Sequence, residues 1–212
     1  IAFTMNLIKT IVRHVMMERF NDISSKPDAP FLGASFRIGN LCTTADVIMG
    51  DVSFKEGEAI KAFTAFLTEI EKMKRYGFTE GELQRAMESI KSSLENEVEA
   101  APTRENGDFI RPLLNNFYKN TPYLVPEFKL DITSQMMPQI NSQVIQGFLE
   151  ANYPTFYSGE NMIILYNGPE KEGLTSPTEQ EILAAIEAVQ NAEIEANAEE
   201  NINEPLISKT LK

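Results

Sequence analysis

The sequence predicts an α+β fold in which an antiparallel or mixed sheet has its helices packed mainly on one face. Three observations lead to this prediction. Several long stretches carry apolar residues at helical spacing, two short stretches between residues 31 and 54 alternate, and turn residues separate them. The chain has 212 residues, of which 42% are hydrophobic and 24% charged, which is enough to fill one core. We expect the α+β domain to span residues 1–175, followed by a helix and acidic linker over residues 176–212.

A long helix and a hairpin are expected first. Apolar residues repeat at helical spacing over Thr4–Ser24, and Pro27 blocks any continuation. Two short strands follow, with Gly39 and Asn40 near the turn between them. An antiparallel hairpin is the simplest arrangement of such strands. The apolar positions expected to alternate are Phe36 and Ile38 in the first strand and Ala45, Val47 and Met49 in the second.

Two well-marked helices come next. Residues 55–77 carry an apolar stripe, basic residues near the end, and Gly77 in the position that closes many helices. Thr79 and Glu82 form a capping-box pattern that begins another helix, which is expected to run to about Ala101. The expected buried side of the first of these helices consists of Ile60, Phe63, Leu67, Ile70 and Met73.

The remaining elements are shorter. A helix kinked or restarted near Pro112 is followed by an extended piece and another helix, and Asn141 or Ser142 is expected to cap the next one. NMIILYNG, residues 161–168, reads as a short buried strand. The last helix is expected to begin with Ser176 as N-cap and to end near Ala192, before an exposed acidic linker.

The charge excludes one class of function. The net charge is −12 at pH 7 and the pI about 4.6, so the chain repels phosphate backbones and is not expected to bind nucleic acid. Eight acidic residues and no Lys or Arg lie between Glu179 and Glu204. No run of about 18 apolar residues is present, so no membrane span is expected. Because the chain starts at Ile1 without Met and ends on a linker-like stretch, we expect it to be a piece of a longer protein.

The residues that carry chemistry are few. His14 is the only histidine, with Glu18 one helical turn later, and Cys42 is the only cysteine. A zinc site needs about three or four ligands, and neither H-E-x-x-H nor H-x-x-E-H is present. His14 and Glu18 are therefore expected to form a weak pair on a partly exposed helix flank. Serine-nucleophile and phosphate-loop motifs are also absent, so we expect no catalytic, cofactor-binding or metal-binding residue in this chain.

Arg19 falls near the middle of the apolar stripe of the first helix. A buried arginine needs a carboxylate or carbonyl partner, because an unpaired charge is costly away from water. We expect a structural ion pair or a side chain that reaches out to the surface, and a role at an interface is the alternative.

Three stretches, in order along the chain, resemble the pitrilysin-like zinc metallopeptidases, the family with an inverted H-x-x-E-H motif. They are RFNDISSKPDAPFLGASF (Arg19–Phe36), GFTEGELQRAMESIKSSLE (Gly77–Glu95) and the tail that begins SPTEQEILAAIEAVQNAEI at Ser176. The resemblance implies the second, non-zinc-binding domain of the first half of such a peptidase, with the family's metallopeptidase or processing-peptidase-like fold. The zinc and its general base are then expected in another domain of the parent protein.

The chain departs from the family at two positions. In the second half of many members an Arg and a Tyr seven residues later anchor the substrate backbone, and Ser24 and Phe31 stand at the matching positions here. Ser24 lacks the charge and Phe31 lacks the hydroxyl. The resemblance thus implies a domain that does not itself hold the scissile carbonyl.

Three functions remain open from the sequence. The first is a non-catalytic structural or substrate-chamber domain of a zinc metalloendopeptidase, which would meet peptide substrate and the other domains of its own polypeptide. The second is a binding or assembly module of an inactive family member. The third is an independent enzyme that uses its own carboxylates, which the missing motifs disfavour. The bacterial periplasm or cell envelope is the expected location, by analogy alone.

Overall fold

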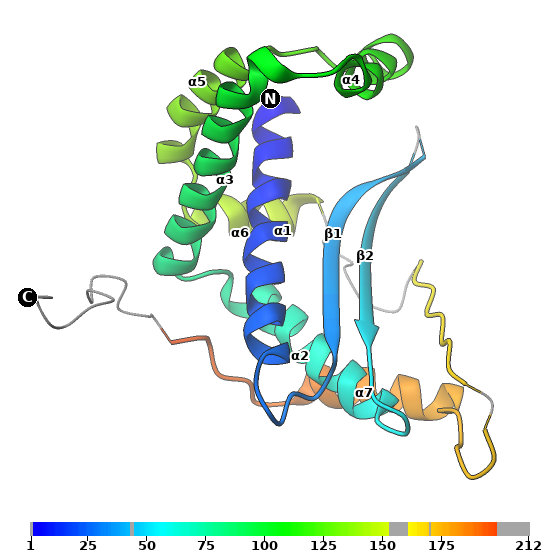
Figure 1. Ribbon diagram of the computed structural model, residues 1–212. Coiled ribbons are helices and arrows are strands. Elements are labelled where there is room, and N and C mark those ends of the chain that lie inside the picture. Colours follow the sequence, from blue (N-terminus) through cyan, green and yellow to red (C-terminus); the bar gives the residue numbers. More distant parts are fainter. Residues whose placement is uncertain (1, 43–44, 153–160, 170, 199–212) are drawn as a thin grey trace, which may run out of the picture.

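A long helix packed beside a β-hairpin forms the centre of the molecule. The computed structural model describes residues 2–42, 45–152, 161–169 and 171–198 (Figure 1). Helix α1 (Ala2–Ser24) lies against the hairpin of β1 (Gly33–Cys42) and β2 (Ala45–Ser53). The prediction of this helix and hairpin is confirmed. The side of α1 that faces the core consists of Leu7, Ile8, Ile11, Val12, Val15, Met16 and Phe20.

Six more helices surround this centre in the described part of the chain. Figure 1 shows α1 between α3 and the hairpin, with α2 and α7 at the lower end of the molecule and α4 at the upper end. The fold is α+β, as predicted, with one face of the sheet packed on the helical core. The remaining elements are α2 (Ala59–Tyr76), α3 (Glu80–Ala100), η1 (Ala101–Thr103), α4 (Asn106–Lys119), α5 (Pro126–Met136), η2 (Met137–Gln139), α6 (Ser142–Asn152) and α7 (Glu179–Asn191).

The hairpin presents the even-numbered residues of β2 to the core. Phe36 pairs with Gly50 and Ile38 with Ile48, so Ile48 and Val52 pack against the core together with Phe36 and Ile38. Ala45, Val47 and Met49, the set expected to alternate in the second strand, lie on the other face. The physical reason lies in α2, because the ring of Phe66 fills the space where a side chain at position 50 would stand. A glycine at that position brings the helix close to the strand.

The start of α3 follows its predicted capping chemistry. The Thr79 hydroxyl accepts a hydrogen bond from the Glu82 N–H at 3.2 Å, and the Glu82 carboxylate accepts one from the Thr79 N–H at 2.9 Å. Gly77 ends α2 at φ 68°, a backbone conformation that glycine adopts without strain. The sharp turn between α2 and α3 is therefore fixed by residues 77–82.

Two predictions for the last third of the chain are wrong. Residues 161–168, expected as a buried strand, do not form one, and Ile163 and Leu165 are exposed. Helix α7 begins after Thr178, not Ser176, because Glu181 stands three residues beyond Thr178 and completes a capping box with it. The chain after α7, expected as an exposed linker, is mostly exposed where it is described, and it contacts the helices as far as Asn197, where it meets Glu82. Residues 199–212 lie outside the described part.

Candidate functional site

The strongest polar cluster joins α1 to the α2–α3 turn. Arg19 Nε donates a hydrogen bond to Glu82 Oε1 at 2.6 Å, and Arg19 Nη2 donates to Glu82 Oε2 at 2.8 Å and to the Gly77 carbonyl at 3.1 Å. The guanidinium lies 4.9 Å from the centre of the Phe78 ring. Arg19 is 7% and Glu82 8% exposed, so the pair is buried. The predicted structural ion pair of Arg19 is confirmed.

Glu82 stays ionised in this setting. Burial alone would raise the pKa of its carboxyl, but the hydrogen bonds and positive charge of Arg19, with the Thr79 N–H, outweigh burial and lower that pKa below its usual value. The sequence marked each residue separately, Arg19 by its place in an apolar stripe and Glu82 by the capping box. Their pairing across 63 positions has no local signal, so only the fold reveals it.

A second set of contacts, here called the clamp, holds the C-terminal arm (residues 192–198). Arg75 donates from Nη1 to the Ala192 carbonyl at 2.8 Å and from Nη2 to the Gln190 carbonyl at 2.7 Å. The Tyr76 hydroxyl donates to the Ile194 carbonyl at 2.6 Å. Cations at the C-terminal end of a helix stabilise its unpaired carbonyls. The clamp therefore closes α7 and ties the start of the arm to the end of α2.

The C-terminal arm reaches the buried ion pair of Arg19 and Glu82 through Asn197. Its Nδ2 donates to Glu82 Oε1 at 3.4 Å, a long hydrogen bond that adds to the two from Arg19. The side chain of Ile194 packs against the hydrophobic core. Sequence reasoning missed this anchoring. The signal available to it was Ile194, the one large apolar residue among the alanines and glutamates of residues 192–198.

His14 and Glu18 form the weak pair that was predicted. His14 Nε2 lies 3.9 Å from Glu18 Oε1, and both side chains are partly exposed. No group of three or more His, Cys, Asp or Glu side chains within the described residues is arranged to hold a metal ion. Zinc takes three or four protein ligands, and this pair supplies two at most. The described residues therefore do not fit a zinc ion.

Ser24 and Phe31, the positions that the sequence resemblance matched to substrate anchors, make only contacts within the domain among those described here. Phe31 is fully buried and meets the ring of Phe20 edge-on, with 6.1 Å between ring centres. Ser24 donates its hydroxyl hydrogen to the Asn21 carbonyl at 3.1 Å within the last turn of α1. Phe31 thus belongs to the hydrophobic core. The cysteine, Cys42, lies exposed at the end of β1.

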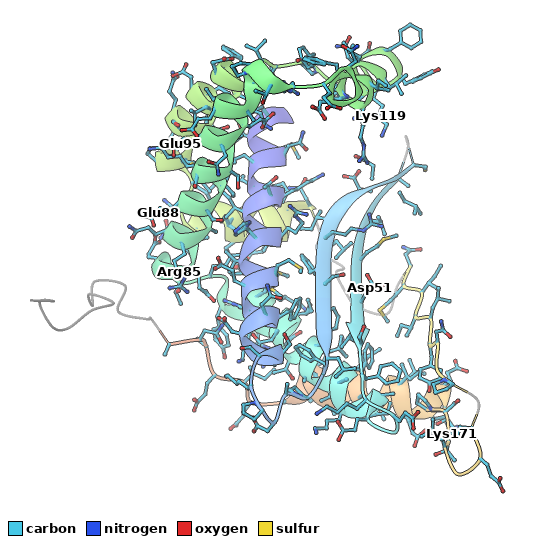
Figure 2. All side chains as sticks on the ribbon, in the orientation of Figure 1. Asp51, Arg85, Glu88, Glu95, Lys119 and Lys171 are labelled. Carbon is cyan, nitrogen blue, oxygen red and sulfur yellow. The ribbon has the colours of Figure 1, made fainter. Side chains whose placement is uncertain are left out.

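Among the hollows of the described surface, two were compared with the candidate residues. One, of about 140 Å³, lies between the β2–α2 connection and residues 166–177, with Glu56 and Glu181 on its rim. The other, of about 740 Å³, is an open groove beside α1 and α3, lined by six polar or charged residues that include Glu18, Asp22 and Arg85. Figure 2 shows Arg85 and Glu88 on α3 pointing outward. Neither lining set contains a histidine or a cysteine that would complete a nucleophile and base.

Comparison with solved structures shows that the fold of this chain also occurs as a part of larger proteases. The chain superposes on the periplasmic protease PqqL from Escherichia coli with a TM-score of 0.73 at 16% identity, covering 96% of this chain and 22% of PqqL. It matches the first half of that protease with a TM-score of 0.72 at 16% identity, covering 92% of this chain and 42% of the half.

A third structure agrees with the first two. It is a mutant of the ferredoxin protease FusC in complex with Arabidopsis ferredoxin, with a TM-score of 0.63 at 16% identity, covering 99% of this chain and 23% of FusC. No protein-family model matches the sequence, and no curated protein matches it. At this identity the likeness shows the fold alone. The chain spans about a fifth of the length of PqqL.

No helix in the described part of the chain combines the length and apolar character needed to cross a lipid bilayer.

Proposed function

We propose that this chain is the second, non-zinc-binding domain in the first half of a pitrilysin-like zinc metallopeptidase. The observation that carries the proposal is the superposition on the first half of PqqL, a periplasmic protease, over 92% of the chain. The sequence stretches that resemble the peptidase family point to the same place. The division into a domain of residues 1–175 and a connection of residues 176–212 toward the next half is part of this proposal.

In this role the chain contributes a wall and a support, and not the reacting groups. Zinc in such a peptidase activates water for attack on a peptide bond, and its ligands would come from another domain. The described residues support this division, because His14 and Glu18 provide at most two ligands and Phe31 is enclosed by the core. The partners of the chain are then the other domains of its own polypeptide and a peptide substrate. A periplasmic location follows from the same analogy.

The coding sequence upstream of Ile1 provides the first test. An intact H-x-x-E-H motif in a preceding domain supports the peptidase. A preceding domain of the same type with degenerate ligands favours the second candidate, a binding or assembly module of an inactive member. A coding sequence with no such domain contradicts both.

The second test uses purified protein. The full-length protein is expected to bind zinc in equimolar amount and to hydrolyse an unfolded substrate such as β-casein, and both properties should be lost when the upstream motif is changed. This chain alone should do neither. Tight, equimolar zinc binding by this chain alone, measured by titration calorimetry, would contradict the proposal.

A further inference from the structure

The apolar side of helix α4 faces away from its own domain. This side, here called the α4 stripe, consists of Ile110, Leu113, Leu114 and Phe117, which recur at the spacing of one helical face, and Tyr118 beside them. All five are about half exposed or more, with Phe117 at 77% and Tyr118 at 73%. No residue of α4 is buried, and none belongs to the hydrophobic core of the described residues or packs against it. Exposed apolar groups that lie together mark interaction sites.

Helix α4 requires a partner for its own stability. An isolated helix of 14 residues is marginal in water, and most of the stability of a helix in a protein comes from packing of its apolar face. Gly107 and Pro112 inside the helix lower its stability further. Its ends are closed locally, because the Asp108 carboxylate accepts a hydrogen bond from the Glu105 N–H at 3.0 Å and Asn120 takes the left-handed conformation. These caps bury no apolar surface, so the partner that covers the stripe must be present permanently.

The stripe is flanked by basic residues in an acidic chain. The net charge is −12, yet residues 109–126 contain Arg111 and Lys119 and neither Asp nor Glu. Both basic residues are exposed. Helix α4 lies at the upper end of the molecule in Figure 1, and Figure 2 labels Lys119 there. The partner that fits this surface is therefore apolar where it meets the stripe and acidic around it, since opposite charges at the rim fix the register of an interface.

We propose that α4 docks through its stripe into a groove on another domain of the full-length protein, and that this groove has an apolar floor and an acidic rim. Ile110, Leu113 and Phe117 are the anchors, because residues spaced i, i+3 and i+7 enter a groove together when a helix binds in this mode. The existence of the other domain rests on the proposed function. The chain covers 42% of the matched half of PqqL, so more than half of that length lies outside the match.

Other occupants fit the stripe less well. A peptide substrate is present for part of the time only and, when unfolded, offers no groove. A second copy brings the same net charge of −12, and neither of the two hollows described above fits a helix, because one is polar and the other holds about 140 Å³. The surface of an anionic bilayer repels a chain of this charge.

Photocrosslinking in the full-length protein tests the docking. Benzoylphenylalanine replaces Phe117, and mass spectrometry maps the crosslinked peptides. The expected crosslinks lie within the same polypeptide, outside residues 1–212, at apolar residues that have Asp or Glu nearby. The same label at Asn116, which is exposed on α4 beside the stripe, is the control and should lose most of this yield.

Four results overturn the docking. Equal yields from positions 116 and 117, or crosslinks within residues 1–212 alone, show that no groove holds the stripe. Crosslinks to added β-casein alone assign the stripe to a substrate. Crosslinks between two copies assign it to self-association. Loss of accessibility at Phe117 only when phosphatidylglycerol vesicles are added assigns it to a lipid surface.

The acidic rim has a test of its own. Lys119→Glu is expected to lower the crosslinking yield of position 117 by roughly threefold or more, whereas Lys119→Arg keeps it, because a like charge at the rim opposes docking. Equal yields in the two variants contradict an acidic rim. Zinc content and casein hydrolysis are measured on the same protein. Their absence with the expected crosslinks refutes the proposed function alone, and their presence without those crosslinks refutes the docking alone.

Discussion

The Glu82 carboxylate accepts hydrogen bonds from Arg19 at 2.6 and 2.8 Å while it closes the capping box with the Thr79 N–H at 2.9 Å. One side chain thus begins α3 and fixes α3 to α1. The arm after α7 reaches the same carboxylate through Asn197. The buried pair is therefore the point where the first helix, the α2–α3 turn and the C-terminal arm meet.

Removal of the Glu82 carboxylate is expected to be costly. Glu82→Ala leaves the Arg19 charge buried without a counterion and opens the capping box, so the free energy of unfolding should fall by about 3–5 kcal/mol. The double variant Arg19→Met with Glu82→Gln removes the charge and keeps a capping side chain. It should be clearly more stable than Glu82→Ala in urea unfolding. A loss below about 1 kcal/mol in Glu82→Ala would show that the pair is not a support of the fold.

The same pair predicts a dependence on pH. The pKa of Glu82 is lowered in the folded state, so its contribution to stability is complete above the unfolded pKa of about 4.3 and is lost as pH falls through the lower folded value. The stability difference between the natural chain and Glu82→Gln should therefore be constant from pH 7 to about 5 and shrink below about pH 4. Urea unfolding at several pH values measures it. A difference that grows as the pH falls would contradict the assignment.

Gly50 is expected to tolerate no side chain. A Cβ at this position would collide with the ring of Phe66, so Gly50→Ala should lower the free energy of unfolding by about 1–3 kcal/mol. Gly39→Ala in β1 is the control, because nothing lies within 4 Å of a Cβ there. Thermal unfolding of the two variants separates steric conflict from a general effect of losing glycine. Equal midpoints would show that Phe66 moves aside at little cost.

Local chemistry explains what the sequence could predict. The capping box of Thr79 and Glu82, the end of α2 at Gly77 and the helical spacing in α1 depend on residues a few positions apart, and all three predictions are confirmed. The need of Arg19 for a partner was also visible, because burial of a charge has a known cost. The identity of that partner was not, since Glu82 lies 63 positions away.

Tertiary contacts explain the failures. The face of β2 that turns inward is set by Phe66 above Gly50, and two alternating apolar sets in one strand do not reveal which of them meets a helix. The arm after α7 reads as a linker by composition, yet Arg75 and Tyr76 fasten it through backbone carbonyls, which every residue carries. Segment 162–169 has a strand sequence, but a strand forms only where an edge is present to pair with it.

His14 is expected to have no part in metal binding or stability beyond its weak pair. His14→Ala should change the free energy of unfolding by no more than about 0.5 kcal/mol, because the 3.9 Å contact with Glu18 is partly exposed. In the full-length protein the same change should leave casein hydrolysis and zinc content as they were. Glu18→Gln is the matched variant. Loss of zinc in either variant would place a ligand where the structure shows a helix flank.

The clamp predicts that the start of the arm can be released without unfolding the domain. Arg75→Met removes the donors to the Ala192 and Gln190 carbonyls, and Tyr76→Phe removes the hydroxyl that meets the Ile194 carbonyl. Tyr76→Phe should cost about 1 kcal/mol or less, because that side chain is about half exposed. Arg75→Met should cost about 2–3 kcal/mol, because it also takes the 2.7 Å ion pair from the buried Glu71 carboxylate and leaves it with Lys74 at 3.8 Å. Their combination should make residues 192–198 cleavable by a protease under native conditions.

Limited proteolysis followed by mass spectrometry locates the cut, and Arg111→Met on α4 is the control for loss of an exposed arginine. A cut within residues 192–198 in the double variant, in protein that still unfolds in one cooperative thermal transition, is the expected result. If the natural chain is cut there equally fast, the clamp does not hold the arm in solution.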